Sequence, residues 1–261
     1  MAIICPEDNA LLFQAWKKLI ISWGAVFAVS LAIGFALIFW FRISPEKLLN
    51  FSTQRLAVAG AVLEKGLRLG IDSSLILFFW NSSGALATIS FIYTASLINP
   101  RNIDRFPRLL RKSLCGQTPM KALCYLPGCS KMNGEPLRRL YVWLMVPLLG
   151  IILLGAECGL IVAAVTRISG SFIVGVVSLL PHGIIEIPAF ALAVAVPFSA
   201  HLLVKKTAGG ITAETVFDQI QAYRRRLSVR NIVWVVVLCL CISGWIEGHI
   251  TPRLLVCLKG Q

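Results

Sequence analysis

The amino-acid sequence predicts an all-α, polytopic membrane protein with about five transmembrane helices and one proline-broken or re-entrant segment. Of its 261 residues, 57% are hydrophobic and only 14% are charged, whereas about a quarter of the residues in soluble domains are charged. The mean hydropathy is +0.79. A soluble protein of this length could not bury so much apolar surface in one core, but lipid solvates such a surface.

The basic residues lie between the hydrophobic runs. The chain has 25 Lys and Arg against 12 Asp and Glu, which gives a net charge of +13. This placement follows the positive-inside rule of membrane proteins, so we do not expect a nucleic-acid partner. The expected partners are membrane lipids and other membrane or envelope proteins. The formation of a homo-oligomer is left undecided. The whole chain, 1–261, is expected to form a single membrane domain.

A transmembrane helix needs about 20 mainly apolar residues, and the chain offers five such runs. The first begins near Leu19, is too long for the apolar core of a signal peptide and lacks a clear cleavage site, so no cleavable signal is expected. The approximate bounds of the five spans are 19–41, 72–98, 140–166, 171–204 and 231–248.

The fourth run, 171–204, has 34 residues and is too long for one ordinary span. Three prolines, Pro181, Pro188 and Pro197, interrupt it. Because proline is well tolerated in the first turn of a helix, we expect a break at Pro181. A short re-entrant or interfacial helix would precede it, and a full helix would start near His182.

Two polar segments lie between the spans. In residues 42–71, apolar residues recur at helical spacing among charged ones, which predicts an amphipathic interfacial helix. Residues 99–139 hold nine Lys and Arg against two acids, and we expect this basic loop to be cytoplasmic.

The basic loop carries three cysteines, Cys115, Cys124 and Cys129, without a CxxC pair. We interpret them as ordinary thiols of a reducing compartment, with a metal or redox site as the alternative. A second basic loop, 205–230, contains Arg224-Arg225-Arg226. We interpret this run as a topology determinant, with contact to anionic lipids as the alternative.

The alternation of spans predicts the topology of a multi-pass protein of the cell membrane. The N-terminus and both basic loops would be cytoplasmic, and the C-terminus would be outside. The segment 42–71 would also lie outside, although it carries five Lys and Arg against two Glu.

Several polar side chains fall inside the apolar runs. A charge in hydrocarbon costs roughly 2.5 to 3.5 kcal/mol on insertion scales, so each such residue is a functional candidate. His182 and Glu186 are four residues apart and share one face of a helix. The predicted topology places them, and other polar residues, in the outer half of the membrane, where all could form one polar pocket. The others are Asn81, Glu157, Glu247 and His249.

Three interpretations of His182, Glu186 and Glu247 stay open. They could lock helices together by hydrogen bonds. They could bind a divalent metal such as zinc with one open position, and Glu157 would then be the candidate base of a metal-dependent intramembrane hydrolase. They could also line the proton or ion pathway of a small transporter or channel, as broken helices often do. The zinc-protease motif H-E-x-x-H is absent, and enzymatic activity is left undecided.

Three segments carry a family resemblance. Leu180-Pro181-His182-Gly183-Ile184-Ile185-Glu186-Ile187-Pro188-Ala189-Phe190 resembles the L-P-H-G-x-x-E-[IL]-P-A motif of the stage II sporulation protein M family. Trp245-Ile246-Glu247-Gly248-His249-Ile250-Thr251-Pro252 is similar to that family's closing motif. Phe79-Trp80-Asn81-Ser82-Ser83-Gly84 looks like a loose version of its second span, with Ser82 in place of the second Asn.

The resemblance covers roughly residues 70–252 and implies a five-span protein with its N-terminus inside and its C-terminus outside. In spore-forming bacteria, the family member anchors cell-wall-degrading partners at the membrane. By resemblance, we expect a non-enzymatic scaffold or assembly protein that recruits partners at the cell envelope. His182, Glu186 and Glu247 are the positions shared with the family's motifs.

Overall fold

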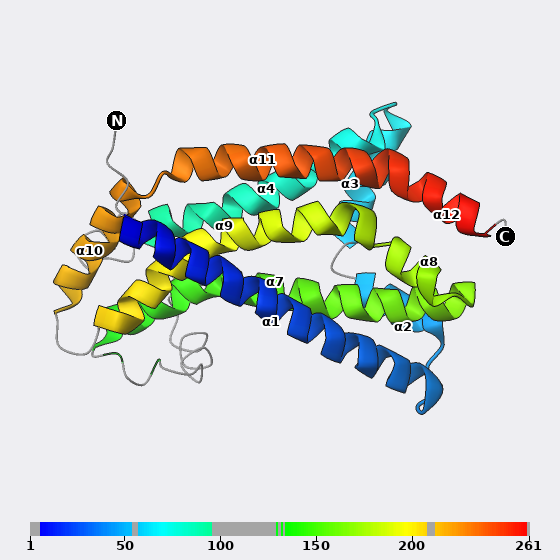
Figure 1. The fold of residues 1–261 in the computed structure, drawn as a ribbon, viewed down its shortest axis with the longest axis horizontal. Helices are drawn as coiled ribbons and strands as arrows, with labels where there is room; N and C mark the ends of the chain where they lie inside the picture. Colours follow the sequence, from blue (N-terminus) through cyan, green and yellow to red (C-terminus); the bar gives the residue numbers. More distant parts are fainter. Residues whose placement is uncertain are drawn as a thin grey trace. The chain divides into compact units, whose positions relative to one another are not determined.

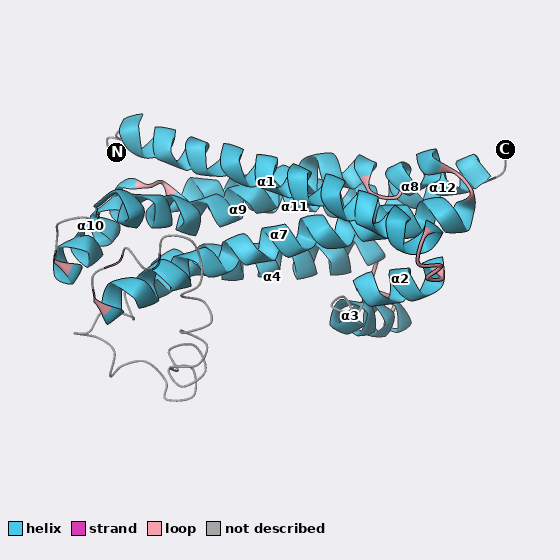
Figure 2. Ribbon diagram, turned by 90° about the horizontal axis from the view of Figure 1, so that it is seen from below, coloured by secondary structure: helices cyan, strands magenta, loops and turns pink. Residues whose placement is uncertain are grey.

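The computed structural model describes residues 6–53, 57–95, 129, 132, 134–207 and 212–259. The regular structure in these ranges is helical, and the described part contains no strand (Figures 1 and 2). Cys115 and Cys124, the first two cysteines of the basic loop, lie outside the described residues. Cys129 is buried.

Among the described residues, five helical segments are long and apolar enough to cross a membrane. This confirms the predicted fold class, because an apolar run of bilayer length can satisfy its backbone polar groups in lipid only as a helix. The first four segments correspond to α1 (Pro6–Phe39), α4 (Ser73–Thr94), α7 (Glu135–Ser169) and α9 (Leu180–Thr207), and the fifth begins with α11 (Val229–Trp245).

The fourth apolar run is broken, but the break precedes Pro181. It falls at Ser178 and Leu179, between α8 (Phe172–Val177) and α9, and Pro181 is the second residue of α9. The Ser178 hydroxyl donates to the carbonyl of Gly175 at 2.7 Å, which satisfies one of the last carbonyls of α8. Pro188 and Pro197 do not interrupt the run, contrary to the sequence-based expectation, and lie inside α9. Neighbouring groups can satisfy the backbone around a proline in a membrane helix.

Within the segment 42–71, the described residues form the helical stretches α2 (Pro45–Thr53) and α3 (Ala57–Arg68). Ser44 caps α2, because its hydroxyl accepts from the backbone N–H of Lys47 at 3.3 Å. Leu48 is 4% exposed and packs in one cluster with Ile38 and Ala164. This contact attaches α2 to α1 and α7.

The helical structure of the last segment continues past Gly248. A five-residue π-helix, η5 (Ile246–Ile250), follows α11 directly, and α12 (Thr251–Lys259) follows η5. The backbone N–H of Thr251 donates to the carbonyl of Ile246, which closes the wider turn of a π-helix. Pro252 lies in the first turn of α12, where its missing N–H does no harm, so the Thr-Pro pair does not stop the helix.

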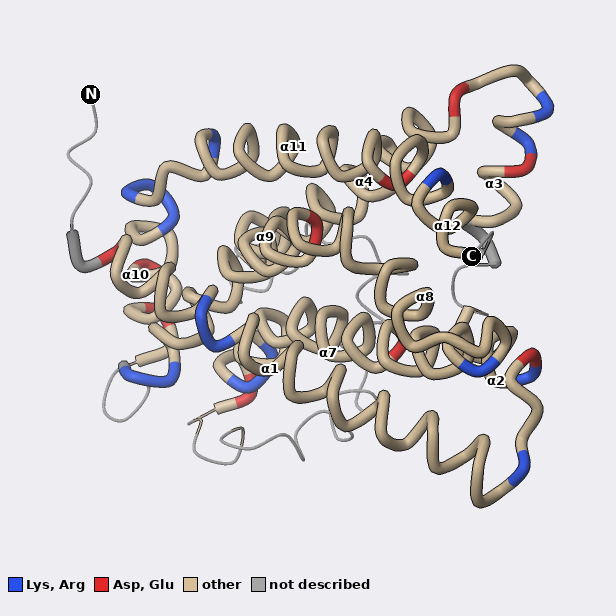
Figure 3. Tube along the Cα trace, turned by 45° about the vertical axis from the view of Figure 1, so that its right-hand side comes forward, with Lys and Arg blue, Asp and Glu red and all other residues tan. Residues whose placement is uncertain are grey.

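The described helices divide into two compact units, and the division cuts each of the five long helices. The first unit comprises Met1–Lys17, Leu86–Leu149 and Leu192–Val233, and the second comprises Lys18–Ala85, Gly150–Ala191 and Trp234–Gln261. Charged residues are sparse along the middle of the long helices (Figure 3). All the polar residues singled out from the sequence as pocket candidates belong to the second unit.

In the first unit, α10 (Ala213–Arg226) is held by buried contacts as well as by charge. The Tyr223 hydroxyl donates to Ser199 Oγ at 2.8 Å, and both side chains are fully buried. Arg226 Nε donates to Asp8 Oδ2 at 2.7 Å. One of the three arginines of the basic run therefore ties α10 to the start of α1, while Arg225 is exposed.

In the second unit, two glycines of α7 allow α1 to approach closely. A Cβ at Gly155 would lie 2.9 Å from the carbonyl oxygen of Trp23, and one at Gly159 would lie 2.5 Å from that of Phe27. The four-residue spacing matches the small-xxx-small pattern of close helix pairs in membranes. The glycines bring the two backbones to a distance that no other residue permits.

A second glycine pair brings α4 against the last span. A Cβ at Gly244 would lie 3.1 Å from the carbonyl oxygen of Ser74, and one at Gly248 would lie 3.0 Å from the backbone nitrogen of Ser74. These contacts fix the start of α4 beside the end of α11 and η5. They thereby bring Asn81 of α4 within reach of polar residues on other helices.

Candidate functional site

Three of the polar residues predicted from the sequence come together in the second unit. His182 and Glu186 of α9 and Glu247 of η5 each offer a ligand atom, and these atoms all lie within 4.8 Å of one another. We call these three residues the His/Glu cluster. His182 is 8% exposed, and the two glutamates are half-buried. The cluster thus joins two segments that are about 60 residues apart in the sequence.

Glu186 is the most firmly held member. Its Oε1 accepts from Asn81 Nδ2 of α4 at 3.1 Å, and its Oε2 accepts from Ser243 Oγ of α11 at 2.9 Å. One carboxylate therefore connects α4, α9 and α11. Because each oxygen has a donor at hydrogen-bond distance, the rotamer of Glu186 is fixed from both sides.

His182 is oriented through its Nδ1 atom, which lies 3.4 Å from Thr251 Oγ1 of α12. Thr251 is 5% exposed, so the contact is shielded. The carbonyl of His182 also lies 3.4 Å from the Ser243 hydroxyl. With Nδ1 facing Thr251, Nε2 is the ring nitrogen left to face another group.

Glu247 reaches the cluster from the π-helix. Such turns are rare and occur often at functional sites, because the extra residue changes the direction in which side chains point. Among the described residues, no donor lies within hydrogen-bond distance of the Glu247 carboxylate, in contrast to that of Glu186.

The other candidate residues are distributed differently. Asn81 lies at the cluster, as described. His249 does not: its Nε2 lies 3.5 Å from Asp72 Oδ2, and its ring stacks on Trp245. Hydrogen bonds from the side chain and backbone of Ser74 lower the pKa of Asp72, so Asp72 is a ready acceptor for His249. Glu157, the candidate base, is half-buried on α7 and is not among the three clustered ligands.

Sequence reasoning missed two residues of the site, Ser243 and Thr251. Both are buried, at 0% and 5% exposure. A signal for them exists in the sequence, because Ser243, Glu247 and Thr251 are spaced four residues apart and such residues share one helix face. Hydroxyl groups are common in membrane helices, however, and often bond only to their own backbone.

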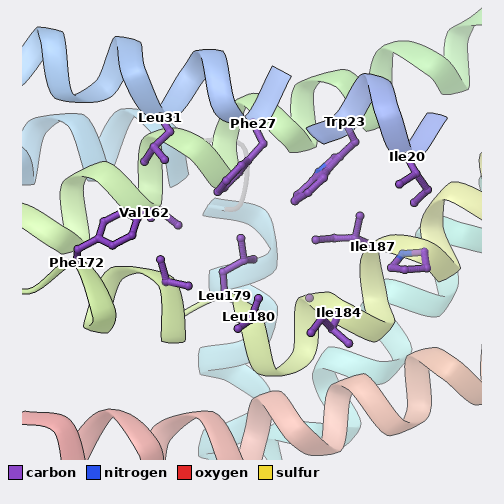
Figure 4. A pocket seen from close by; sticks show the side chains of 13 residues that line it. Ile20, Trp23, Phe27, Leu31, Val162, Phe172, Leu179, Leu180, Ile184 and Ile187 are labelled. Atoms are coloured by element: carbon purple, nitrogen blue, oxygen red, sulfur yellow. The ribbon is translucent and has the colours of Figure 1, made fainter. Parts of the chain in front are cut away.

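The second unit also contains a cavity of about 370 Å³. Aromatic and aliphatic side chains of α1, α7, α8 and α9 line it, including Trp23, Phe27 and Phe172 (Figure 4). Its α9 wall consists of Leu180, Gly183, Ile184, Ile187 and Pro188. This spacing defines one face of α9, and His182 and Glu186 belong to another. The cavity is therefore an apolar space, separate from the cluster.

The arrangement can hold a cation. Imidazole and carboxylate are ligands for zinc and similar divalent metals, and a carboxylate pair can also share a proton. Hydrolysis would further require a general base within hydrogen-bond reach of the attacked atom. Glu157, the candidate base, is not among the three grouped ligands.

Comparison with known proteins shows which family the chain belongs to. The searches of curated proteins and of solved structures gave no match. The model of the family named Stage II sporulation protein M matches residues 26–252, which include all three cluster residues and their hydrogen-bond partners. On this match, which covers most of the sequence, the chain is an integral membrane protein and belongs to the stage II sporulation protein M family.

Proposed function

We propose that this protein is a non-enzymatic scaffold or assembly protein of the cell envelope, which recruits partners at the membrane. The observation that carries the proposal is the pair of hydrogen bonds made by Glu186, to Asn81 of α4 and to Ser243 of α11. A single side chain at membrane depth is used to hold three spans in one arrangement.

The physical argument concerns rigidity. Interhelical hydrogen bonds in membrane proteins contribute on average about 0.6 kcal/mol each and at most about 1.7. Together with the glycine contacts of α7 and α11, they favour one packing of the helices over others. A fixed framework suits a protein that presents a constant surface to partners, whereas a transporter must alternate between two arrangements.

The proposal includes the orientation of the chain. The basic residues of the first unit, among them those of α10, would face the cytoplasm, and α12 would lie at the outer surface. In a variant with every cysteine except Cys257 replaced, the one remaining thiol is exposed on α12. A membrane-impermeant maleimide should label this thiol in intact cells. In a second variant, all native cysteines including Cys257 are replaced and Arg225→Cys is introduced. This thiol should be labelled only after permeabilisation. The reverse pattern would overturn the orientation.

Recruitment can be tested by isolating the tagged chain in polymer nanodiscs cut directly from its native membrane. Quantitative mass spectrometry should then find one or more envelope proteins in a fixed ratio to the chain. An unrelated five-span protein with the same tag and expression level is the control that identifies bystanders. Recovery of the chain alone, or of its own copies only, would contradict the scaffold proposal.

A further inference from the structure

We propose that the His/Glu cluster is a divalent-cation site, with zinc as the best-fitting metal, that ties α9 to the end of the fifth span. The first argument is charge. Two carboxylates share a space in which each ligand atom lies within 4.8 Å of the others. Ionised groups at membrane depth cost several kcal/mol unless they are compensated. Among the described residues, no Lys or Arg pairs with Glu186 or Glu247, so a cation or protons must supply the compensation.

The second argument is the identity and number of the ligands. One imidazole and two carboxylates form a donor set that zinc accepts, with a fourth position for water. Ligands of a tetrahedral zinc ion at 2.0 to 2.2 Å are about 3.4 Å apart. The Glu247 side chain, which has no hydrogen-bond donor to hold it, can rotate to bring its carboxylate closer to the other two ligands.

The third argument is that the groups around the ligands are already in place. Metal-binding side chains are usually oriented by a second set of hydrogen bonds, which fixes the tautomer of a histidine and the direction of a carboxylate. Thr251 stands at Nδ1 of His182, and Asn81 and Ser243 stand at the two oxygens of Glu186. These hydrogen-bond partners are the kind that orients metal ligands.

The fourth argument is the π-helix. A regular helix through Ile246–Ile250 would contain one residue fewer per turn and would rotate Glu247 relative to the residues that follow. Glu247 lies within this turn and Thr251 directly follows it, and both lie near His182, one as a ligand and one as its hydrogen-bond partner. A rare backbone turn located at the ligand itself is the kind of local feature that accompanies binding sites.

The direct test is the metal content of protein purified without a polyhistidine tag. The wild type should contain about one zinc ion per chain after dialysis against metal-free buffer. His182→Ala and Glu247→Gln should each lower the content or the affinity roughly tenfold or more, and Thr251→Val should weaken binding by about 10- to 100-fold. Two matched controls, His249→Ala and Glu157→Gln, should bind as the wild type does, because neither residue belongs to the cluster.

Thermal unfolding in detergent gives a second readout for variants that fold poorly. A chelator should lower the Tm of the wild type, and added zinc should restore it, whereas the Tm of Glu247→Gln should respond to neither. Wild-type protein without metal, or His182→Ala with an undiminished zinc content, would overturn the proposal and leave proton sharing or the cysteines as the explanation. Metal content is measured on the isolated chain and recruitment in native membranes, so either proposal can fail without the other.

Discussion

Leucine in place of Gly159 is expected to destabilise the protein by about 3 kcal/mol or more, at the upper end of the cost of overpacking. The new Cβ would lie 2.5 Å from the carbonyl oxygen of Phe27 and 2.7 Å from the backbone nitrogen of Leu31. Both are backbone atoms of α1, so no side-chain rotation can relieve the contact and the helices must separate. Unfolding of the purified protein in mixed micelles with increasing SDS measures the free energy.

The matched control is Gly150→Leu, the same substitution nine residues earlier on α7. Gly150 is exposed, and a Cβ there would meet nothing within 4 Å. Its free energy of unfolding should stay within about 0.5 kcal/mol of the wild-type value, as for most surface substitutions. Equal losses in the two variants would show that leucine in α7 acts through something other than the contact with α1.

Glu186→Leu is expected to cost about 2 kcal/mol even in the absence of metal. The substitution removes the Glu186 acceptor of the Asn81 amide and one of the two acceptors of the Ser243 hydroxyl, which also contacts the carbonyl of His182. A buried polar group left unpaired costs about 1 to 3 kcal/mol, although hydrogen bonds between membrane helices contribute less on average. The same SDS titration, carried out in the presence of a chelator, separates this loss from any contribution of a bound cation.

A triple variant, Asn81→Leu, Ser243→Ala and Glu186→Leu, tests the reason for that loss. Replacing both partners of a buried polar contact with apolar groups can be nearly neutral, whereas removing one partner is not. The triple variant should therefore be more stable than Glu186→Leu alone. A triple variant that is less stable than the single one would show that packing around these residues, and not their hydrogen bonds, determines the loss.

The number of spans could be read from the sequence because it depends on local properties. An apolar run of about 20 residues in lipid has few alternatives to a helix, and each of the five runs contains one helix long enough to cross a membrane, or the start of such a segment. The exact ends of the helices were harder to predict from the sequence. Pro188, Pro197 and Pro252 are all helical, since a membrane environment and a first-turn position make proline tolerable where a soluble helix would end.

The candidate site was predictable only where its members lie close together in the sequence. His182 and Glu186 share a face of α9 because they are four residues apart, and this spacing follows from the helical repeat. Asn81, Ser243 and Thr251 meet them from other helices, and such contacts depend on which helices are neighbours and how each is rotated. Nothing in the period of one helix determines these quantities.

By itself, therefore, the sequence determined that the chain is a five-span helical membrane protein with acids and an imidazole at membrane depth. Only the tertiary structure decided that Glu247 faces His182 while His249, two residues later, turns to Asp72. Because residues two apart in a helix point to nearly opposite sides, the physical reason lies in which groups pack against each side. The glycine contacts with α4 then fix which neighbours those side chains meet.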